Sequence, residues 1–168
     1  WEIFLICGEK REYLGIQFEI ILIQMANQAI IVERLLNAPA SKVWNAITDR
    51  EEMKDWYFNL EEFKAEPGFR FQFPGGPSPE KQYLHLCEIT EVIPESKITY
   101  SWKYDGYTGI SFVNFELFPD GERTLVKLTH TGLETFPPEI PDFERHNFEA
   151  GWDEIINSSL KNYLEGGK

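Results

Sequence analysis

The stretch PDFERHNFEAGWDEIINSSLKNYLE, residues 141–165, has helical periodicity and no proline after its first residue. Residues of one face recur in it at spacings of three and four, which is the period of a buried helical face; they are Phe148, Trp152, Ile155, Ile156, Ser159 and Tyr163, and Leu160 and Leu164 widen the stripe. Asp142 is the expected cap, and Gly166-Gly167 is the expected stop. At 1.5 Å per residue the helix would be about 36 Å long. A helix of that length with one apolar face needs a broad surface to pack on.

The preceding part of the chain supplies that surface. From Leu60 to Leu133 it reads as consecutive strands separated by turn signals, without helical periodicity, which predicts an antiparallel meander. A long helix on a curved antiparallel sheet leaves a layer between them. That layer is either filled by large side chains or kept as a cavity for an apolar ligand.

The expected elements follow a simple order. A first strand, Gln28–Leu36, precedes two short helical segments, Ala40–Asp49 and Arg50–Trp56. Six more strands are predicted from alternation and turn signals: Leu60–Ala65, Phe69–Phe73, Gln82–Ile93, Lys97–Tyr104, Gly109–Phe118 and Arg123–Thr131. The segment Pro74–Pro79 is expected to be a loop, either at the rim of a pocket or simply at the surface.

Composition excludes several classes of function. The 168 residues, 42% hydrophobic and 15% aromatic, are enough for one domain with a real core. The net charge of -12 and the absence of any basic run argue against nucleic acid and anionic membranes as partners. Cys7 and Cys87 form no metal or disulfide pattern, so we expect a reducing, cytoplasmic setting. The three histidines lack metal-ligand spacing, and we expect neither a metal nor a cofactor.

The first residues do not resemble the rest. The chain begins with Trp1, whereas Met25 looks like an ordinary start that is followed at once by a strand. We therefore expect residues 1–24 to be an extension outside the fold and residues 25–168 to be the domain. An added edge strand that uses Ile16, Phe18 and Ile20 is the alternative, and a targeting role is a further one.

Several short motifs in this order resemble one family. They are APASKVWNAITD (38–49), DWY (55–57), TLVKLTHTGL (124–133) and Gly151-Trp152 in the last helix. With them the chain resembles the activator of heat-shock-protein-90 ATPase homologue-like branch of the START-like (SRPBCC, Bet v 1-like) superfamily, over Gln28 to Glu165.

The resemblance implies an α+β helix-grip fold. In it a seven-stranded antiparallel sheet wraps a long C-terminal helix and encloses a cavity. The namesake co-chaperone has a further N-terminal domain that engages the chaperone, and we expect no counterpart within the 24 residues before Met25. The superfamily hosts many functions on one scaffold, so activity must be argued from the site itself.

The inward faces of such a fold supply the candidate ligand-binding residues. Strand alternation and the helical stripe would turn these side chains toward one another: Phe71, Phe73, Tyr100, Trp102, Tyr104, Phe115, His130, Phe148, Trp152 and Ile156. The alternative is that they only fill the core, with His130 bonded to a neighbouring carbonyl. Gly151 inside the helix indicates close approach to a strand or to a ligand, because a helical glycine costs about 1 kcal/mol relative to alanine.

No pattern of catalytic residues is present. The sequence has no GxSxG, no glycine-rich phosphate loop and no HExxH. The first hypothesis is therefore non-catalytic binding of a small hydrophobic or aromatic molecule between sheet and helix. The alternatives are a protein-interaction module, such as a chaperone accessory, and a cyclase- or hydrolase-type enzyme that uses the same cavity.

Overall fold

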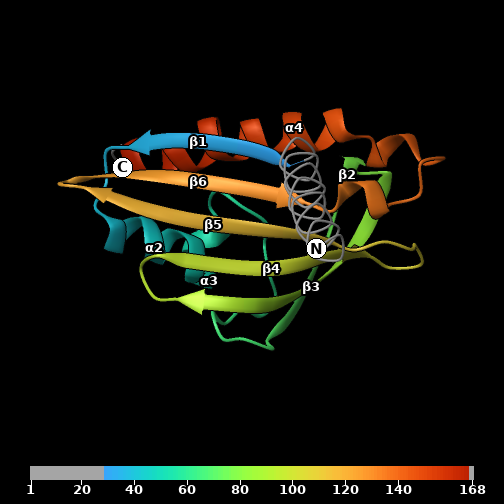
Figure 1. Ribbon diagram of the computed structural model, residues 1–168, viewed down its shortest axis with the longest axis horizontal. Helices are drawn as coiled ribbons and strands as arrows, with labels where there is room; N and C mark the ends of the chain where they lie inside the picture. Colours follow the sequence, from blue (N-terminus) through green and yellow to red (C-terminus); the bar gives the residue numbers. More distant parts are fainter. Residues whose placement is uncertain (1–28, 167–168) are drawn as a thin grey trace, which may run out of the picture.

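The computed structural model describes residues 29–166, drawn in colour in Figure 1. The predicted N-terminal extension 1–24, with its alternative edge strand, lies outside the described residues.

Six strands form one antiparallel sheet with the order β1-β6-β5-β4-β3-β2. Apart from β1, every strand pairs with the next one along the chain, so the expected meander is confirmed. β1 closes the arrangement by pairing with β6, with Ile30 opposite His130. The strands are β1 (Ile30–Leu36), β2 (Arg70–Ser78), β3 (Lys81–Ile93), β4 (Lys97–Tyr104), β5 (Ser111–Asp120) and β6 (Arg123–Thr131).

The helices all lie on one side of this sheet, behind the strands in the view of Figure 1. Two short ones follow β1, as predicted. The connection after β6 holds two 3-10 turns. The continuous C-terminal helix, residues 145–165, then runs along β1, and we call it the rod. The helices are α2 (Ala40–Thr48), α3 (Arg50–Met53), η1 (Leu133–Thr135), η2 (Pro141–Phe143), α4 (Arg145–Asp153), η3 (Glu154–Leu160, a π-helix) and α5 (Lys161–Glu165). This curled sheet with its C-terminal helix is the predicted helix-grip fold.

The rod buries one side chain at every fourth position: Phe148, Trp152, Ile156, Leu160 and Leu164. In a regular α-helix four residues turn through about 400°, so each step of such a stripe would drift by about 40°. The π-helical turn of η3 is wider and takes up part of that drift. The wider turn of η3 therefore helps to keep the buried stripe on one side of the rod.

The start of the rod differs from the prediction. Residues Pro141–Phe143 form a separate 3-10 turn, and Glu144 stands at the N-cap without a side-chain bond to the helix. Asp142 does not cap the helix. Its carboxylate instead accepts a hydrogen bond from the Tyr83 hydroxyl of β3 at 2.6 Å. The expected stop is confirmed, because Gly166 follows the last helical residue.

Two predictions in the first half of the sheet were wrong. Residues Leu60–Ala65 form no strand, so residues 29–166 contain six strands rather than seven. Conversely, Pro74–Ser78 belongs to β2, where a bulge between Gly75 and Ser78 absorbs the glycines and prolines. Turn residues at a bulged edge strand are compatible with pairing, because an edge strand needs only one row of hydrogen bonds.

Candidate functional site

All ten predicted ligand-binding residues are buried between the sheet and the rod. Strands β2, β4, β5 and β6 contribute Phe71, Phe73, Tyr100, Trp102, Tyr104, Phe115 and His130, and the rod contributes Phe148, Trp152 and Ile156. Their rings pack on one another. Trp102 contacts Trp152 edge-on with ring centroids 5.7 Å apart, and Tyr100 lies 6.4 Å from Phe115. The predicted inward side chains of sheet and helix therefore do face one another.

The centre of this layer is filled. The enclosed space beside Tyr100 and Phe115 measures about 10 Å³, and Tyr57 covers it with its hydroxyl 2.9 Å from that of Tyr100. A site needs roughly that volume to hold a single water molecule. Most of the predicted residues therefore act as core, and any small molecule must bind nearer the end of the layer.

A series of hydrogen bonds crosses the layer at His130, from the rod to the sheet. The Trp152 indole N–H donates to His130 Nδ1 at 2.8 Å, and His130 Nε2 lies 2.8 Å from Ser111 Oγ. The Ser111 hydroxyl lies 3.4 Å from the carbonyl of Trp102. Because Nδ1 accepts from an indole, the imidazole proton must be on Nε2, from which it donates to the serine. His130 is therefore bonded to Trp152 and Ser111 rather than to the neighbouring carbonyl that the sequence suggested.

This tautomer is the wrong one for catalysis. A histidine that activates a serine must accept the hydroxyl proton, whereas His130 Nε2 donates to Ser111. Burial also lowers the pKa of His130 to about 3, so the ring stays neutral. The Ser111–His130–Trp152 chain is a satisfied structural network that ties β5 and β6 to the rod.

Gly151 does not approach a strand. It is exposed, and a Cβ built on it would have no atom of another element within 4 Å. The predicted contact with a strand was therefore wrong, and nothing in residues 29–166 explains the glycine.

An open pocket lies where the layer ends, between the β2–β3 hairpin and the start of the rod. We call it the mouth pocket. Its volume is about 270 Å³, and half of its lining residues carry aromatic rings: Gly75, Gly76, Pro77, Tyr83, His85, Tyr104, Asp142, Phe143, Asn147 and Phe148. Tyr104 and Phe148 were predicted as ligand-binding residues, and of the two positions left open for the segment 74–79, a pocket rim or the plain surface, Gly75, Gly76 and Pro77 take the first. The other side chains were missed, although alternation along β3 places Tyr83 and His85 on the face of the buried Cys87.

The rim of the mouth pocket carries a charge pair. Lys81 Nζ lies 2.5 Å from Asp142 Oδ2, which also accepts the Tyr83 hydroxyl. The hydrogen bonds from Lys81 and Tyr83 lower the pKa of Asp142, and the same bond to Asp142 raises the pKa of Tyr83. The rim is therefore a salt bridge with no net charge, and Tyr83 is fixed by it.

The floor of the mouth pocket is neutral as well. His85 stacks on Phe73 with centroids 4.5 Å apart, and its Nδ1 lies 3.2 Å from the Phe73 carbonyl. Desolvation lowers the pKa of His85 to about 4, against the opposite effect of backbone hydrogen bonds to Phe73 and Tyr83. Behind His85 lies Trp102, whose buried indole N–H makes no hydrogen bond of normal geometry among the described residues. A buried donor without a good partner costs about 1–3 kcal/mol.

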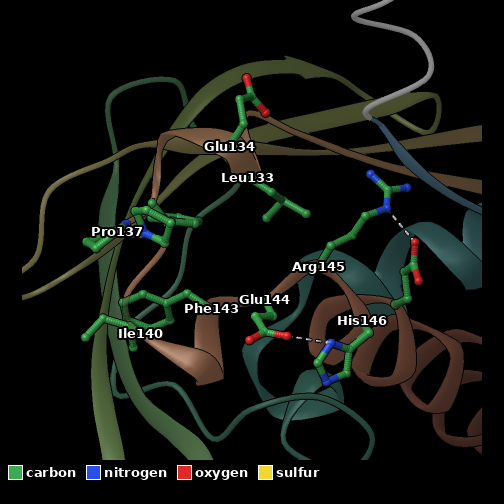
Figure 2. Close-up of a pocket in the computed structure, with 11 residues that line it drawn as sticks. Leu133, Glu134, Pro137, Ile140, Phe143, Glu144, Arg145 and His146 are labelled. Carbon is green, nitrogen blue, oxygen red and sulfur yellow. Dashed lines mark hydrogen bonds and ion pairs between the residues drawn. The ribbon is translucent and has the colours of Figure 1, made fainter.

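A second, larger hollow lies on the far side of Phe143, where the connection meets the rod (Figure 2). Its volume is about 610 Å³, and Leu133, Phe136 and Ile140 form its apolar part. Four of its polar side chains form two pairs. Arg145 Nε donates to Glu149 at 2.6 Å, and His146 lies 3.3 Å from Glu144, as Figure 2 shows. None of the predicted binding residues lines it.

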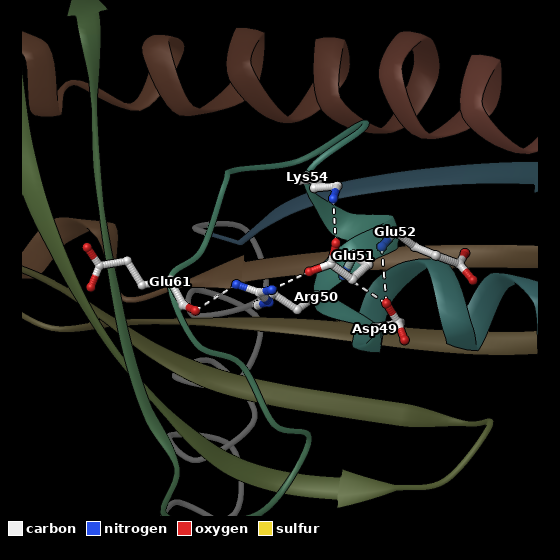
Figure 3. Close-up of polar contacts among 6 residues, drawn as sticks. All are labelled: Asp49, Arg50, Glu51, Glu52, Lys54 and Glu61. Atoms are coloured by element: carbon white, nitrogen blue, oxygen red, sulfur yellow. Dashed lines mark hydrogen bonds and ion pairs between the residues drawn. The ribbon is translucent and has the colours of Figure 1, made fainter.

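Other polar groups of the described chain form no further site. Figure 3 shows the cluster around α3, in which Asp49 caps the helix by accepting from the backbone N–H groups of Glu51 and Glu52. Arg50 and Lys54 both pair with Glu51 at the surface. Within residues 29–166 no three His, Cys, Asp or Glu side chains converge as metal ligands, and no helix is long and apolar enough to cross a membrane.

Comparison with known proteins places this fold in a family. A family profile described as "Activator of Hsp90 ATPase homolog 1-like protein" matches residues 37–165. No curated protein sequence matches significantly.

Solved structures resemble the chain over most of its length. DynU16, a protein of the dynemicin biosynthetic locus, aligns with a TM-score of 0.68 and 23% identity over 84% of this chain and 48% of its own, so this chain spans about half of that protein. BH1534 from Bacillus halodurans aligns with a TM-score of 0.64 and 25% identity over 82% and 96%. The Aha1 dimer from Colwellia psychrerythraea gives a TM-score of 0.61 and 22% identity over 83% and 98%.

Proposed function

Since the chain belongs to the Activator of Hsp90 ATPase homolog 1-like family, whose helix-grip layer ends here in an open pocket, we propose that it binds a small, uncharged aromatic molecule in the mouth pocket. The observation that carries this proposal is the lining of that pocket, which joins an aromatic floor to a few fixed polar groups. That combination is typical of small-molecule sites.

The size of the pocket limits the ligand. A cavity of about 150 Å³ is large enough for benzene, and the mouth pocket has about 270 Å³. The filled layer behind it leaves no room for a longer molecule to pass inward. One or two fused rings are therefore the expected size, and a lipid chain is too long.

The charge of the pocket limits the ligand further. Lys81 and Asp142 neutralise one another at the rim, and His85 is uncharged at neutral pH. The protein as a whole has a net charge of -12, which repels anions. A neutral ring system would therefore bind better than the same ring system with a carboxylate.

A substitution that blocks the mouth pocket tests this proposal. Asn147 is an exposed rod residue that lines the pocket, so Asn147→Trp would cover the mouth without entering the core. Ala150→Trp, also exposed but outside the pocket, is the matched control. Saturation-transfer NMR with naphthalene should give binding to wild type and to Ala150→Trp but not to Asn147→Trp, and 2-naphthoate should bind more weakly. If naphthalene binds Asn147→Trp as well as wild type, or binds no variant, the proposal fails.

A second candidate function is association of two copies through the outer face of the sheet. Ile31, Leu35 and Phe118 on that face are 52%, 41% and 45% exposed, respectively. Leu35 and Phe118 both pair with Leu125 of β6, so Leu35, Leu125 and Phe118 form one apolar row across β1, β6 and β5. Ile31 lies four residues further along β1, opposite Thr129. Exposed apolar rows of this kind occur at protein interfaces.

The neighbouring row on that face is self-complementary. Glu33, Lys127, Glu116 and Lys97 are cross-strand neighbours and alternate in sign. A copy turned by a two-fold axis presents this row in reverse order, which sets each charge against its opposite. Light scattering at increasing concentration should reveal a dimer that Phe118→Ser abolishes, and a monomer at every concentration would contradict this candidate.

We also propose a reducing compartment, which the cytoplasm provides. Cys87 is the free cysteine of residues 29–166, and it is buried. Burial raises the pKa of its thiol, so it is an inert core residue rather than one half of a disulfide. Labelling with a thiol reagent should be slow in the folded protein and fast after denaturation.

A further inference from the structure

The mouth pocket and the hollow of Figure 2 meet at one side chain. Among the described residues, Phe143 is the one that lines both spaces. It ends the turn η2, with Asp142 before it at the mouth pocket and Glu144 after it at the hollow. The two spaces measure about 270 and 610 Å³, respectively. Phe143 therefore stands at the boundary between a small pocket and a larger one.

The ring of Phe143 is packed into this boundary. It stacks on Tyr104 of the mouth pocket, with centroids 4.2 Å apart and planes inclined by 15°. On the other side its centroid lies 5.6 Å from that of Phe136, which lines the hollow. Phe143 itself is only 6% exposed. A ring held between the two linings blocks direct passage from one space to the other.

The turn that carries Phe143 is bonded on both sides. Toward the sheet, the carboxylate of Asp142 accepts the Tyr83 hydroxyl at 2.6 Å. Toward the rod, the side-chain amide of Asn147 donates to the carbonyl of Pro141 at 2.9 Å. These bonds reach two different elements, so they fix the turn against both β3 and the rod. The position of the Phe143 ring is fixed with it.

Resting on the proposed binding function, we propose that Phe143 determines the size of the ligand by dividing one longer groove into two. With Phe143 in place, the mouth pocket accepts one or two fused rings. A shorter side chain would join this pocket to the apolar part of the hollow, formed by Leu133, Phe136 and Ile140. The benzyl group removed is about the size of benzene, which a cavity of about 150 Å³ accommodates. The joined groove would therefore accept one further ring linked to the first two.

Two uncharged probes test this role. Naphthalene has the two fused rings that the mouth pocket accepts, and N-phenyl-1-naphthylamine adds a phenyl group through one N–H. Wild type should bind naphthalene and exclude the longer probe. In Phe143→Ala the longer probe should gain affinity on the order of ten-fold or more, because its phenyl group leaves water. Naphthalene should lose affinity in the same variant, because one wall of its pocket is removed. Fluorescence titration of the longer probe and saturation-transfer NMR of naphthalene give the two affinities.

Two further variants guard against loss of folding and against a general effect of cavity size. Phe143→Leu leaves an apolar side chain in the core but shortens the wall, so it should give a smaller gain for the longer probe even if Phe143→Ala does not fold. Leu133→Ala is the matched control. Leu133 is also buried and lines the hollow, but it lies away from Phe143 (Figure 2). This control should leave the longer probe excluded.

A blocked mouth pocket shows whether the longer probe occupies both spaces. Naphthalene should displace it from Phe143→Ala, and adding Asn147→Trp to that variant should abolish its binding, because Asn147 lines the mouth pocket. Binding that survives both treatments would place the longer probe in the hollow alone and would overturn the proposed role of Phe143.

The outcomes separate the two proposals. If wild type binds naphthalene but neither Phe143 variant gains affinity for the longer probe, Phe143 does not set the size limit, while the pocket function stands. The same conclusion follows if wild type or Leu133→Ala binds the longer probe as tightly as Phe143→Ala does. If wild type does not bind naphthalene, both proposals fail.

Discussion

Two histidines on the inner face of the sheet, His130 and His85, differ in how the polar groups around them are hydrogen-bonded. Around His130, every polar atom has a partner: the indole of Trp152 on one side and the hydroxyl of Ser111 on the other. Around His85, the buried indole N–H of Trp102 has only the Tyr104 hydroxyl as a polar neighbour, and it makes no hydrogen bond of normal geometry within residues 29–166. In both places a neutral histidine lies beside a tryptophan: Trp152 of the rod for His130 and Trp102 of β4 for His85.

The difference separates structure from function. A satisfied network in a low-dielectric layer holds elements in one arrangement and offers nothing to a ligand. A buried donor without a good partner costs stability. The same residue types thus join the sheet to the rod at His130, whereas at His85 they lie beside the open mouth pocket.

The largest expected effect is the loss of stability at low pH. Both histidines have a folded-state pKa below the ordinary 6.5, about 4 for His85 and about 3 for His130, because burial disfavours the charged ring. The unfolded chain therefore binds more protons below pH 6.5, and stability is lost as the pH falls, by about 1.4 kcal/mol per pH unit for each histidine. Urea unfolding at about pH 7 and about pH 5.5 should differ by roughly 2–3 kcal/mol.

The two histidines can be separated in the same experiment. His85→Gln should remove about half of that pH dependence, leaving the part that belongs to His130. His146→Gln, at an exposed position, is the control and should keep all of it. Equal pH dependence in the wild type and in His85→Gln would show that His85 is not held neutral by the fold.

The next test uses one substitution at two sites. Trp152→Phe and Trp102→Phe remove the same atoms from two buried positions, which are 3% and 5% exposed. Only Trp152→Phe leaves a former partner, His130 Nδ1, unpaired. We expect Trp152→Phe to lower the free energy of unfolding by about 1–3 kcal/mol more than Trp102→Phe. Equal losses in urea unfolding would mean that the indole bond to His130 contributes nothing.

The smallest effect comes from two hydroxyls. Tyr57→Phe leaves the buried hydroxyl of Tyr100 without its partner at 2.9 Å and should cost about 1 kcal/mol. Tyr104→Phe removes a hydroxyl that lines the open pocket and has the Trp102 indole N–H as its polar neighbour, and it should cost less, about 0.5 kcal/mol. Thermal melts of the two variants give the comparison directly. A larger loss in Tyr104→Phe would contradict this order.

Much of the fold could be read from local patterns. Alternation predicted β4 and β6 with their observed bounds, Lys97–Tyr104 and Arg123–Thr131, because half-buried antiparallel strands repeat every two residues. The segment Leu60–Ala65 also alternates, yet it pairs with no strand. Pro74–Ser78 reads as a loop, yet it pairs with β3 across a bulge. Strand pairing depends on a partner, which local sequence does not contain.

The candidate site was harder to predict. Tyr104 and Phe148 were identified because they belong to strong periodic faces, whereas His85 and Asp142 were overlooked. Asp142 carries the usual signature of a helix cap, and only the approach of Tyr83 and Lys81 reveals that it forms a rim instead. A carboxylate bonds to whichever donor comes within reach, and that donor is set by the packing of distant segments.

The sequence by itself determined the two layers of this protein, because the period of its apolar residues states which face of each element must leave water. It also determined that those faces are aromatic and that the molecule is acidic. Only the tertiary structure decided that both ring nitrogens of His130 bond to other side chains, whereas His85 lines an open pocket. That distinction depends on which donor lies within about 3 Å of a ring nitrogen, and in this protein Trp152 of the rod reaches one histidine while the mouth pocket faces the other.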